Sequence, residues 1–183
     1  MNPKFADGTF QGIEGSEEAL LRKHLCGLSG EGVEIGCCDG YSTVIILEAS
    51  NLHLTSIDPL IKDSVEHTLR GDVNRLLRNT EPFPFRFTFL KDFSPPSSFS
   101  DYPLDFVFID GDHSYDAVVR DIKYWAPRLK LGGLLAIHDC RMDRPGGAKF
   151  HEGPTQAANE LIFNQPQWEV VGEAFSLAIF KKL

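Results

Sequence analysis

The chain has 183 residues, 42% of them hydrophobic and 24% charged, a composition typical of a globular protein large enough to bury a full core. Its formal net charge is −8 and it has no basic cluster, which argues against nucleic acid and anionic membrane surfaces as partners. No apolar run approaches the roughly 20 residues of a membrane span, and no signal-peptide core is present, so we expect a cytoplasmic protein.

The N-terminal segment is predicted to be irregular up to residue 15, with a helix after it. Ser16 can cap this helix, and the acids Glu17 and Glu18 then fall in its first turn, where they complement the helix dipole. Leucines at helical spacing continue the pattern to Leu28. This segment therefore precedes the first predicted strand as one amphipathic helix.

A glycine turn connects a short strand over residues 33–36 to a helix over 44–50. Its glycines, Gly36 and Gly40, would let the backbone approach a ligand and aim helix N–H groups at it. The Gly-x-x-x-Gly spacing differs from the dinucleotide pattern, which disfavours a nicotinamide or flavin. A tight connection without a ligand is the alternative. Two of the four cysteines, Cys37 and Cys38, lie in this turn. Without metal-finger spacing, all four are predicted to be buried free thiols, and the alternative is a redox or metal role for the Cys37-Cys38 pair.

The second strand, over residues 52–57, is followed by Asp58. An acid at this position, roughly 20 residues after a glycine turn, is typical of sites that hydrogen-bond ribose hydroxyls. The alternative is an ordinary turn acid before Pro59. Position and motif together favour the ribose interpretation.

A long helix over residues 62–79 and a third strand over 85–90 come next in the predicted order. Asp92 and Ser94 follow that strand. Either residue could meet the edge of an adenine ring, but both residue types also cap loops through their own backbone.

The fourth strand, over residues 105–110, is an uninterrupted apolar run that ends in Asp110. A run without alternation indicates a strand covered on both faces, as in a parallel sheet. Asp112 and His113 follow at once, and Ser114 can cap a helix that runs to about residue 130, where a Gly-Gly pair ends it.

Another apolar strand, over residues 134–137, is followed by His138 and Asp139. Two neighbouring buried strands thus finish in Asp and His at the edge where open α/β sheets bind ligands. After a loop over 141–153 and a helix ending near residue 164, two closing strands over 168–173 and 176–181 predict an antiparallel edge.

These motifs carry a resemblance to a known family. Residues 33–43 resemble the first motif of class I S-adenosylmethionine-dependent methyltransferases. Residues 108–115, the Gly-Gly pair at 132–133 and His138-Asp139 resemble the methyltransferase-24 family. The resemblance implies an α/β fold: a doubly wound, seven-stranded, mostly parallel Rossmann-like sheet with an antiparallel C-terminal hairpin. It implies one methyltransferase domain over 1–183, with residues 1–30 as an N-terminal extension and helix.

The same resemblance implies a set of site residues. S-adenosylmethionine would be bound by Glu34, Gly36, Gly40, Asp58, Ser94 and Asp110, with Asp92 or Phe93 as further neighbours of adenine. His113 would be the general base, with Asp110 at the reacting centre. A divalent metal would be held by Asp110, Asp139 and His138. Relatives often have two acids where this chain has His138-Asp139, and imidazole suits zinc, manganese or iron better than magnesium.

The predicted reaction is O-methylation of a small-molecule hydroxyl. The chain is too short for a dedicated acceptor domain, so we expect a small acceptor or a pocket completed by a second subunit in a homodimer. Two other functions fit the residues. The protein could bind S-adenosylmethionine without catalysis, or it could be a metal-dependent hydrolase built on the acids and histidines after the fourth and fifth strands.

Overall fold

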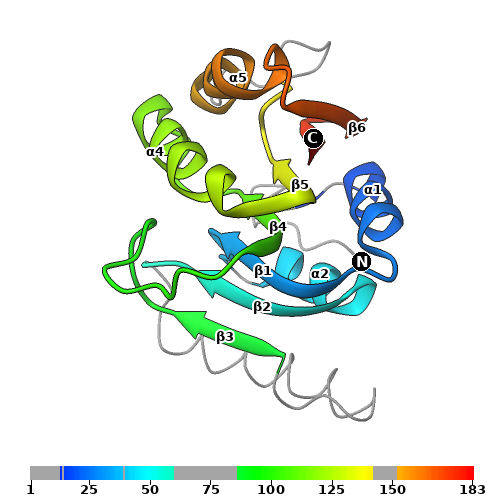
Figure 1. Cartoon of the computed structure of the whole chain (residues 1–183), viewed down its shortest axis with the longest axis vertical. Coiled ribbons are helices and arrows are strands. Elements are labelled where there is room, and N and C mark those ends of the chain that lie inside the picture. The colour runs from blue at the N-terminus through cyan, green and yellow to red at the C-terminus, as the bar shows by residue number, and fades with distance from the viewer. Residues whose placement is uncertain (1–12, 14, 39, 60–85, 142–151) are drawn as a thin grey trace, which may run out of the picture.

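The computed structural model describes residues 13, 15–38, 40–59, 86–141 and 152–183. Their core is a sheet of seven strands in the order β3-β2-β1-β4-β5-β7-β6 (Figure 1). The strands are β1 (Ser29–Ile35), β2 (Asn51–Ile57), β3 (Phe87–Leu90), β4 (Leu104–Ile109), β5 (Leu129–Ile137), β6 (Trp168–Ala174) and β7 (Leu177–Lys182). The predicted seven-stranded α/β fold is therefore confirmed.

The first five strands of the sheet run parallel, and the last two give it an antiparallel end. β1 pairs in parallel with both β2 and β4, and β5 continues the parallel part beside β4. β7 pairs antiparallel with β5 and with the edge strand β6, as the closing hairpin predicted. The carboxyl ends of β1, β2, β4 and β5 consequently meet at one edge of the sheet, on both sides of the point where the strand order reverses.

Helices cover both faces of the sheet (Figure 1). α1 (Gly15–Leu25) and α2 (Tyr41–Ala49) pack on one face, and α4 (Tyr115–Trp125) and α5 (Glu152–Ala158) pack on the other. The central strands contribute buried residues to both apolar layers, which explains their continuous apolar sequence. Among the residues that the structure describes, no helix has the length and apolar character needed to cross a bilayer.

Several element boundaries differ from those expected. α1 ends at Leu25 instead of Leu28, β1 begins at Ser29 instead of residue 33, and α2 begins at Tyr41 instead of residue 44. The helix predicted to reach residue 130 ends at Trp125 and is followed by a 3₁₀ turn over Ala126–Arg128, because Pro127 has no N–H with which to continue the helix. β5 begins at Leu129, so the Gly-Gly pair at 132–133 lies inside a strand and does not end a helix. The predicted helix 62–79 and most of the loop 141–153 lie outside the described residues.

Candidate active site

Gly36 joins the end of β1 to the end of β4. Its backbone has a φ of 78°, and its N–H donates to the carbonyl of Ile57 at 2.9 Å. A Cβ atom at this position would lie 2.2 Å from the carbonyl oxygen of Asp110. Only glycine combines this left-handed conformation with such a close approach. The glycine turn and the strand that ends in Asp110 are thus in direct backbone contact.

Asp58 holds the same turn from the β2 side. Its Oδ2 atom accepts hydrogen bonds from the backbone N–H groups of Cys37 and Cys38, each at 3.1 Å. The carboxylate is mostly buried and lies beside the glycine turn, as the motif predicted. Contact with ribose hydroxyls stays a prediction, and the observed hydrogen bonds give Asp58 a second role in shaping the turn.

Glu34 is fully buried, on the side of β1 that faces α2. Its carboxylate accepts hydrogen bonds from the hydroxyls of Ser42 and Thr43, each at 2.6 Å, and from the hydroxyl of Ser56. Burial raises the pKa of Glu34 to about 7, although the three hydrogen bonds act in the opposite direction. Glu34 therefore ties β1 to β2 and to the first turn of α2, while its predicted contact with the methionine end of the cofactor stays a prediction.

This burial predicts a pH-dependent stability. Because the folded pKa of about 7 lies above the ordinary glutamate pKa of 4.5, Glu34 stabilises the fold most below pH 4.5, and this contribution is lost as the pH rises through 7. We expect the free energy of unfolding of the wild type, relative to Glu34→Gln, to fall by about 3 kcal/mol over that window. Urea unfolding of the wild type and Glu34→Gln at several pH values measures this difference. Glu31→Gln, on the same strand, is the control. A constant difference would contradict the prediction.

The residues expected near adenine lie after β3. The Ser94 hydroxyl donates to Asp121 at 2.6 Å and accepts from the Trp125 indole at 2.9 Å, so it is engaged with α4. Asp92 accepts from the backbone N–H of Phe93 at 2.8 Å, which agrees with the loop-capping alternative. Phe93 itself is 70% exposed. An adenine contact of Ser94 is neither supported nor contradicted by these bonds, and Phe93 offers the accessible apolar surface.

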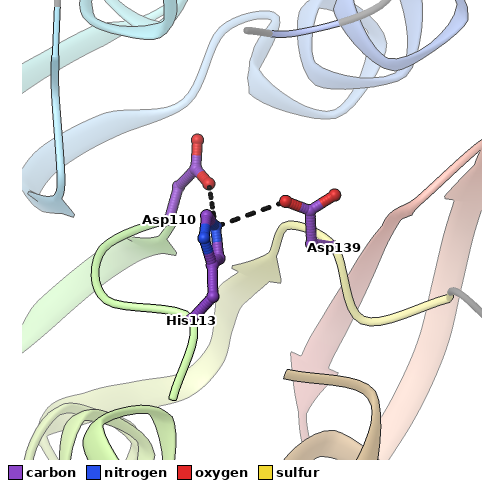
Figure 2. Close-up of side chains that lie close together, drawn as sticks. All are labelled: Asp110, His113 and Asp139. Carbon is purple, nitrogen blue, oxygen red and sulfur yellow. Dashed lines mark ion pairs between the residues drawn. The ribbon is translucent and has the colours of Figure 1, made fainter. Parts of the chain in front are cut away.

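Asp110, His113 and Asp139 come together at the carboxyl edge of the sheet. Figure 2 shows the imidazole of His113 directed toward both carboxylates. Its Nε2 atom lies 3.5 Å from Oδ1 of Asp110 and 3.3 Å from Oδ2 of Asp139. Each residue offers one ligand atom in a group whose members lie within 4.8 Å of one another, which is a geometry that could hold a metal ion.

The conformation of Asp139 helps to build this cluster. Its φ of 54° is in the left-handed region, which aspartate tolerates better than most residues. Asp112, a candidate ligand only in the hydrolase alternative, accepts the backbone N–H of Ser114 at 2.8 Å and so caps the turn before α4. Ser114 occupies the N-cap position as predicted, but its side chain makes no capping hydrogen bond.

His138 lies behind the cluster and is only 8% exposed. Its Nδ1 atom lies 3.2 Å from Oδ1 of Asp110 and 3.4 Å from Oδ2 of Asp139. Its Nε2 atom lies 3.2 Å from Oε2 of Glu17, on α1. His138 was expected as a metal ligand, and in this arrangement it bridges the two acids and Glu17.

Glu17 is a functional candidate that the sequence interpretation missed, because it was assigned to the first turn of a helix as a dipole partner. It is 1% exposed and accepts from the backbone N–H of Ser176 at 3.0 Å. One signal was available. Glu17, Leu21 and Leu25 fall at i, i+4 and i+8, so the acid occupies the buried stripe of α1.

The charges of the cluster reinforce one another. Burial alone would raise the pKa of Asp110, but His138 and His113 hold it down to about 2. The hydrogen bond to Asp110 raises the pKa of His113. Burial would lower the pKa of His138, yet the surrounding carboxylates raise it well above its usual range. Among themselves, these side chains thus favour protonated histidines between ionised acids.

The cysteines contribute no cluster with the other candidate ligands in the described part of the chain. Cys37 and Cys140 are buried free thiols, as predicted, and burial raises the pKa of Cys140 to about 12. Cys26 and Cys38 are exposed, so the prediction that all four thiols are buried is wrong. Cys38 lies in the glycine turn with a positive φ of 42°.

The sequence is similar to known methyltransferases. A model of the methyltransferase-24 family, described as a methyltransferase domain, matches residues 33–140, which is more than half of the chain. An uncharacterized protein of Acanthamoeba polyphaga mimivirus is 26% identical over 117 residues, covering 58% of this chain and 50% of that protein. The chain therefore matches about half the length of this curated relative.

Solved structures share the fold. An rRNA methylase from Streptococcus thermophilus has a TM-score of 0.64 and 14% identity, with 94% of this chain and 99% of that chain covered. The TDP-rhamnose 3'-O-methyltransferase of calicheamicin biosynthesis has a TM-score of 0.62 and 11% identity, with 90% and 76% covered. At these identities the likeness shows the common architecture and leaves the methyl acceptor open.

Proposed function

Because the chain belongs to the methyltransferase-24 family of class I S-adenosylmethionine-dependent methyltransferases, we propose that it methylates a hydroxyl group of a small molecule with the help of a divalent cation. The observation that carries this proposal is the backbone contact between Gly36 and Asp110. It joins the glycine turn, where the family binds its cofactor, to the cluster of acids and histidines that could act on the acceptor.

The cofactor site is assigned to the turn between β1 and α2 and to the end of β2. S-adenosylmethionine supplies a methyl group that is already activated on a sulfonium centre. Gly36 and Gly40 leave room for its methionine end, next to Glu34, which holds the first turn of α2 through Ser42 and Thr43. Asp58 faces the ribose, and Asp110 lies toward the reacting centre. Phe93, which is exposed beside the end of β3, offers a surface on which adenine can stack, next to Ser94.

The donor set fits a divalent cation. Asp110 and Asp139 each present a carboxylate oxygen. His138 Nδ1 lies within 3.4 Å of both acids and would be the nitrogen donor, so that His113 need not bind the cation. A mixed nitrogen and oxygen set suits zinc, manganese or iron better than magnesium or calcium. A cation held there would polarise the acceptor hydroxyl and make its proton more acidic.

His113 is the proposed general base. Its imidazole is 36% exposed, so an acceptor can reach it, whereas His138 is 8% exposed. Methyl transfer requires the acceptor oxygen in line with the sulfonium methyl, and a base within hydrogen-bond reach to take the hydroxyl proton. The hydrogen bond to Asp110 raises the pKa of His113, and a cation that neutralised Asp110 and Asp139 would weaken this effect and leave His113 able to accept a proton.

A small acceptor is favoured over RNA. The similar solved structures include both a TDP-rhamnose 3'-O-methyltransferase and an rRNA methylase. The net charge of −8 and the absence of a basic cluster disfavour a polyanionic acceptor, since phosphate contacts dominate nucleic-acid affinity. A pocket completed by a second copy of the chain is compatible with this proposal.

Ligand titration tests the proposal. S-adenosylmethionine should raise the melting temperature of the protein, because a ligand that binds only the folded state stabilises it by mass action. Zinc or manganese should add a further rise that a chelator reverses. The absence of any shift with S-adenosylmethionine would contradict the cofactor site. A shift with cofactor but none with cations would leave a metal-independent methyltransferase, and tight cation binding without cofactor binding would favour the hydrolase alternative.

A further inference from the structure

Glu17 connects the N-terminal helix to the ends of β5 and β7. Its Oε1 atom accepts from the Ser176 backbone N–H at 3.0 Å and from the Ser176 hydroxyl at 2.7 Å. Its Oε2 atom lies 3.2 Å from Nε2 of His138. Both Glu17 and His138 are buried, at 1% and 8% exposure. A buried carboxylate in this position needs partners, and it finds them far from its own helix in the sequence.

The direction of these hydrogen bonds follows from the chemistry of the groups. A carboxylate can only accept, and the backbone N–H of Ser176 can only donate, so Oε1 is fixed by Ser176. The remaining oxygen, Oε2, then requires a proton on His138 Nε2. This fixes the orientation of the ring and turns Nδ1 toward Asp110 and Asp139, at 3.2 and 3.4 Å.

We propose that Glu17 is a positioning residue of the cation site, which accepts the Nε2–H of His138 and so holds Nδ1 against Asp110 and Asp139. The inference rests on the cation-assisted function proposed above. Histidines at metal sites commonly donate their second N–H to a carboxylate, which fixes both the tautomer and the ring. Glu17 supplies that carboxylate from α1, a helix that contributes none of the three grouped ligand atoms.

Glu17→Gln isolates this role at nearly constant volume. The amide has one oxygen, and the Ser176 N–H requires it, so the amide N–H₂ group faces His138 Nε2. Nε2 must then accept, and the proton moves to Nδ1. We expect the affinity for Co²⁺, measured by calorimetry and by its visible absorption, to fall about 10- to 100-fold. Glu18→Gln is the matched control, since Glu18 contacts Arg22 and Tyr41 and should leave this affinity unchanged.

A mutant cycle separates positioning from general stability. If Glu17 acts through His138, Glu17→Gln should add no further loss of Co²⁺ affinity in the His138→Ala background. Equal affinity of Glu17→Gln and wild type, or additive losses, would overturn the inference. Should a variant not fold, long-range ¹H–¹⁵N correlation of the Zn²⁺-loaded wild type decides: a proton on His138 Nε2 is expected, and its absence contradicts the inference.

The wild type also separates this inference from the methyltransferase function. Each sample is titrated with S-adenosylmethionine as well as Co²⁺. A wild type that binds the cofactor but shows no affinity for Co²⁺ would overturn the role of Glu17 and leave the methyltransferase function standing. Cofactor binding should be equal in wild type and Glu17→Gln, because Glu17 lies on the far side of His138 from the cluster.

Discussion

Replacing Gly36 with alanine should abolish binding of S-adenosylmethionine and lower the free energy of unfolding by roughly 3 kcal/mol or more. Two effects add at this position. An alanine would have to adopt a φ of 78°, and its Cβ atom would lie 2.2 Å from the Asp110 carbonyl oxygen. Since this neighbour is backbone, relief requires the ends of β1 and β4 to separate, which would open the proposed cofactor site.

Gly132→Ala is the matched control for this prediction. Gly132 has a φ of 81°, nearly that of Gly36, but no atom lies within 4 Å of a Cβ built there. The free energy of unfolding of Gly132→Ala should therefore be only about 1 kcal/mol below that of the wild type, because only the backbone conformation is unfavourable for alanine. Urea unfolding gives the free energies and calorimetry gives the cofactor affinity. Similar losses in the two variants would show that the contact with Asp110 is unimportant.

Replacing His113 with alanine should lower the rate of methyl transfer by about 100- to 10,000-fold, the usual contribution of a general base. Binding of S-adenosylmethionine should change little, because His113 reaches the cluster from the loop after β4 and contacts neither the glycine turn nor Asp58 in the interactions described above. The measurement is transfer of labelled methyl to a pool of hydroxylated small molecules, with the cofactor affinity taken in parallel.

His53→Ala is a suitable control, because His53 is a solvent-facing histidine of β2 with 62% side-chain exposure. It should retain both transfer and cofactor binding. Unchanged transfer by His113→Ala would rule out the base assignment. If His113→Ala has a lower affinity for S-adenosylmethionine but transfers methyl normally when saturated with it, His113 binds the cofactor and is not the base.

The central strands could be predicted because strands that are buried on both faces have a continuous apolar sequence. The run Phe106–Ile109 is apolar at every position, which occurs when both faces of a strand are covered. Parallel pairing then brings strand ends together, so the convergence of Asp110 and Asp139 follows from the sequence pattern. The start of β5 was not predictable in the same way, because a Gly-Gly pair ends helices as readily as it bends strands.

The polar contacts of the site could not be predicted from the sequence, because their partners come from segments far apart in the chain. The Ser94 hydroxyl is engaged by Asp121 and Trp125 of α4, which no local pattern reveals. His138 was correctly placed at the strand end. Its partner Glu17 lies 121 residues away in sequence, and only the packing of α1 beside β5 and β7 brings the two together.

The parallel sheet, the glycine turn and the acids that end β2, β4 and β5 could all be predicted from the sequence, because hydrophobic periodicity and backbone conformation are local properties. The use of these side chains depends on how distant elements pack together. This packing buried Glu34 among three hydroxyls, directed His113 between Asp110 and Asp139, and set Glu17 behind His138. Charge interactions and desolvation act through space over a few ångströms, so they depend on which helix packs against which strand end.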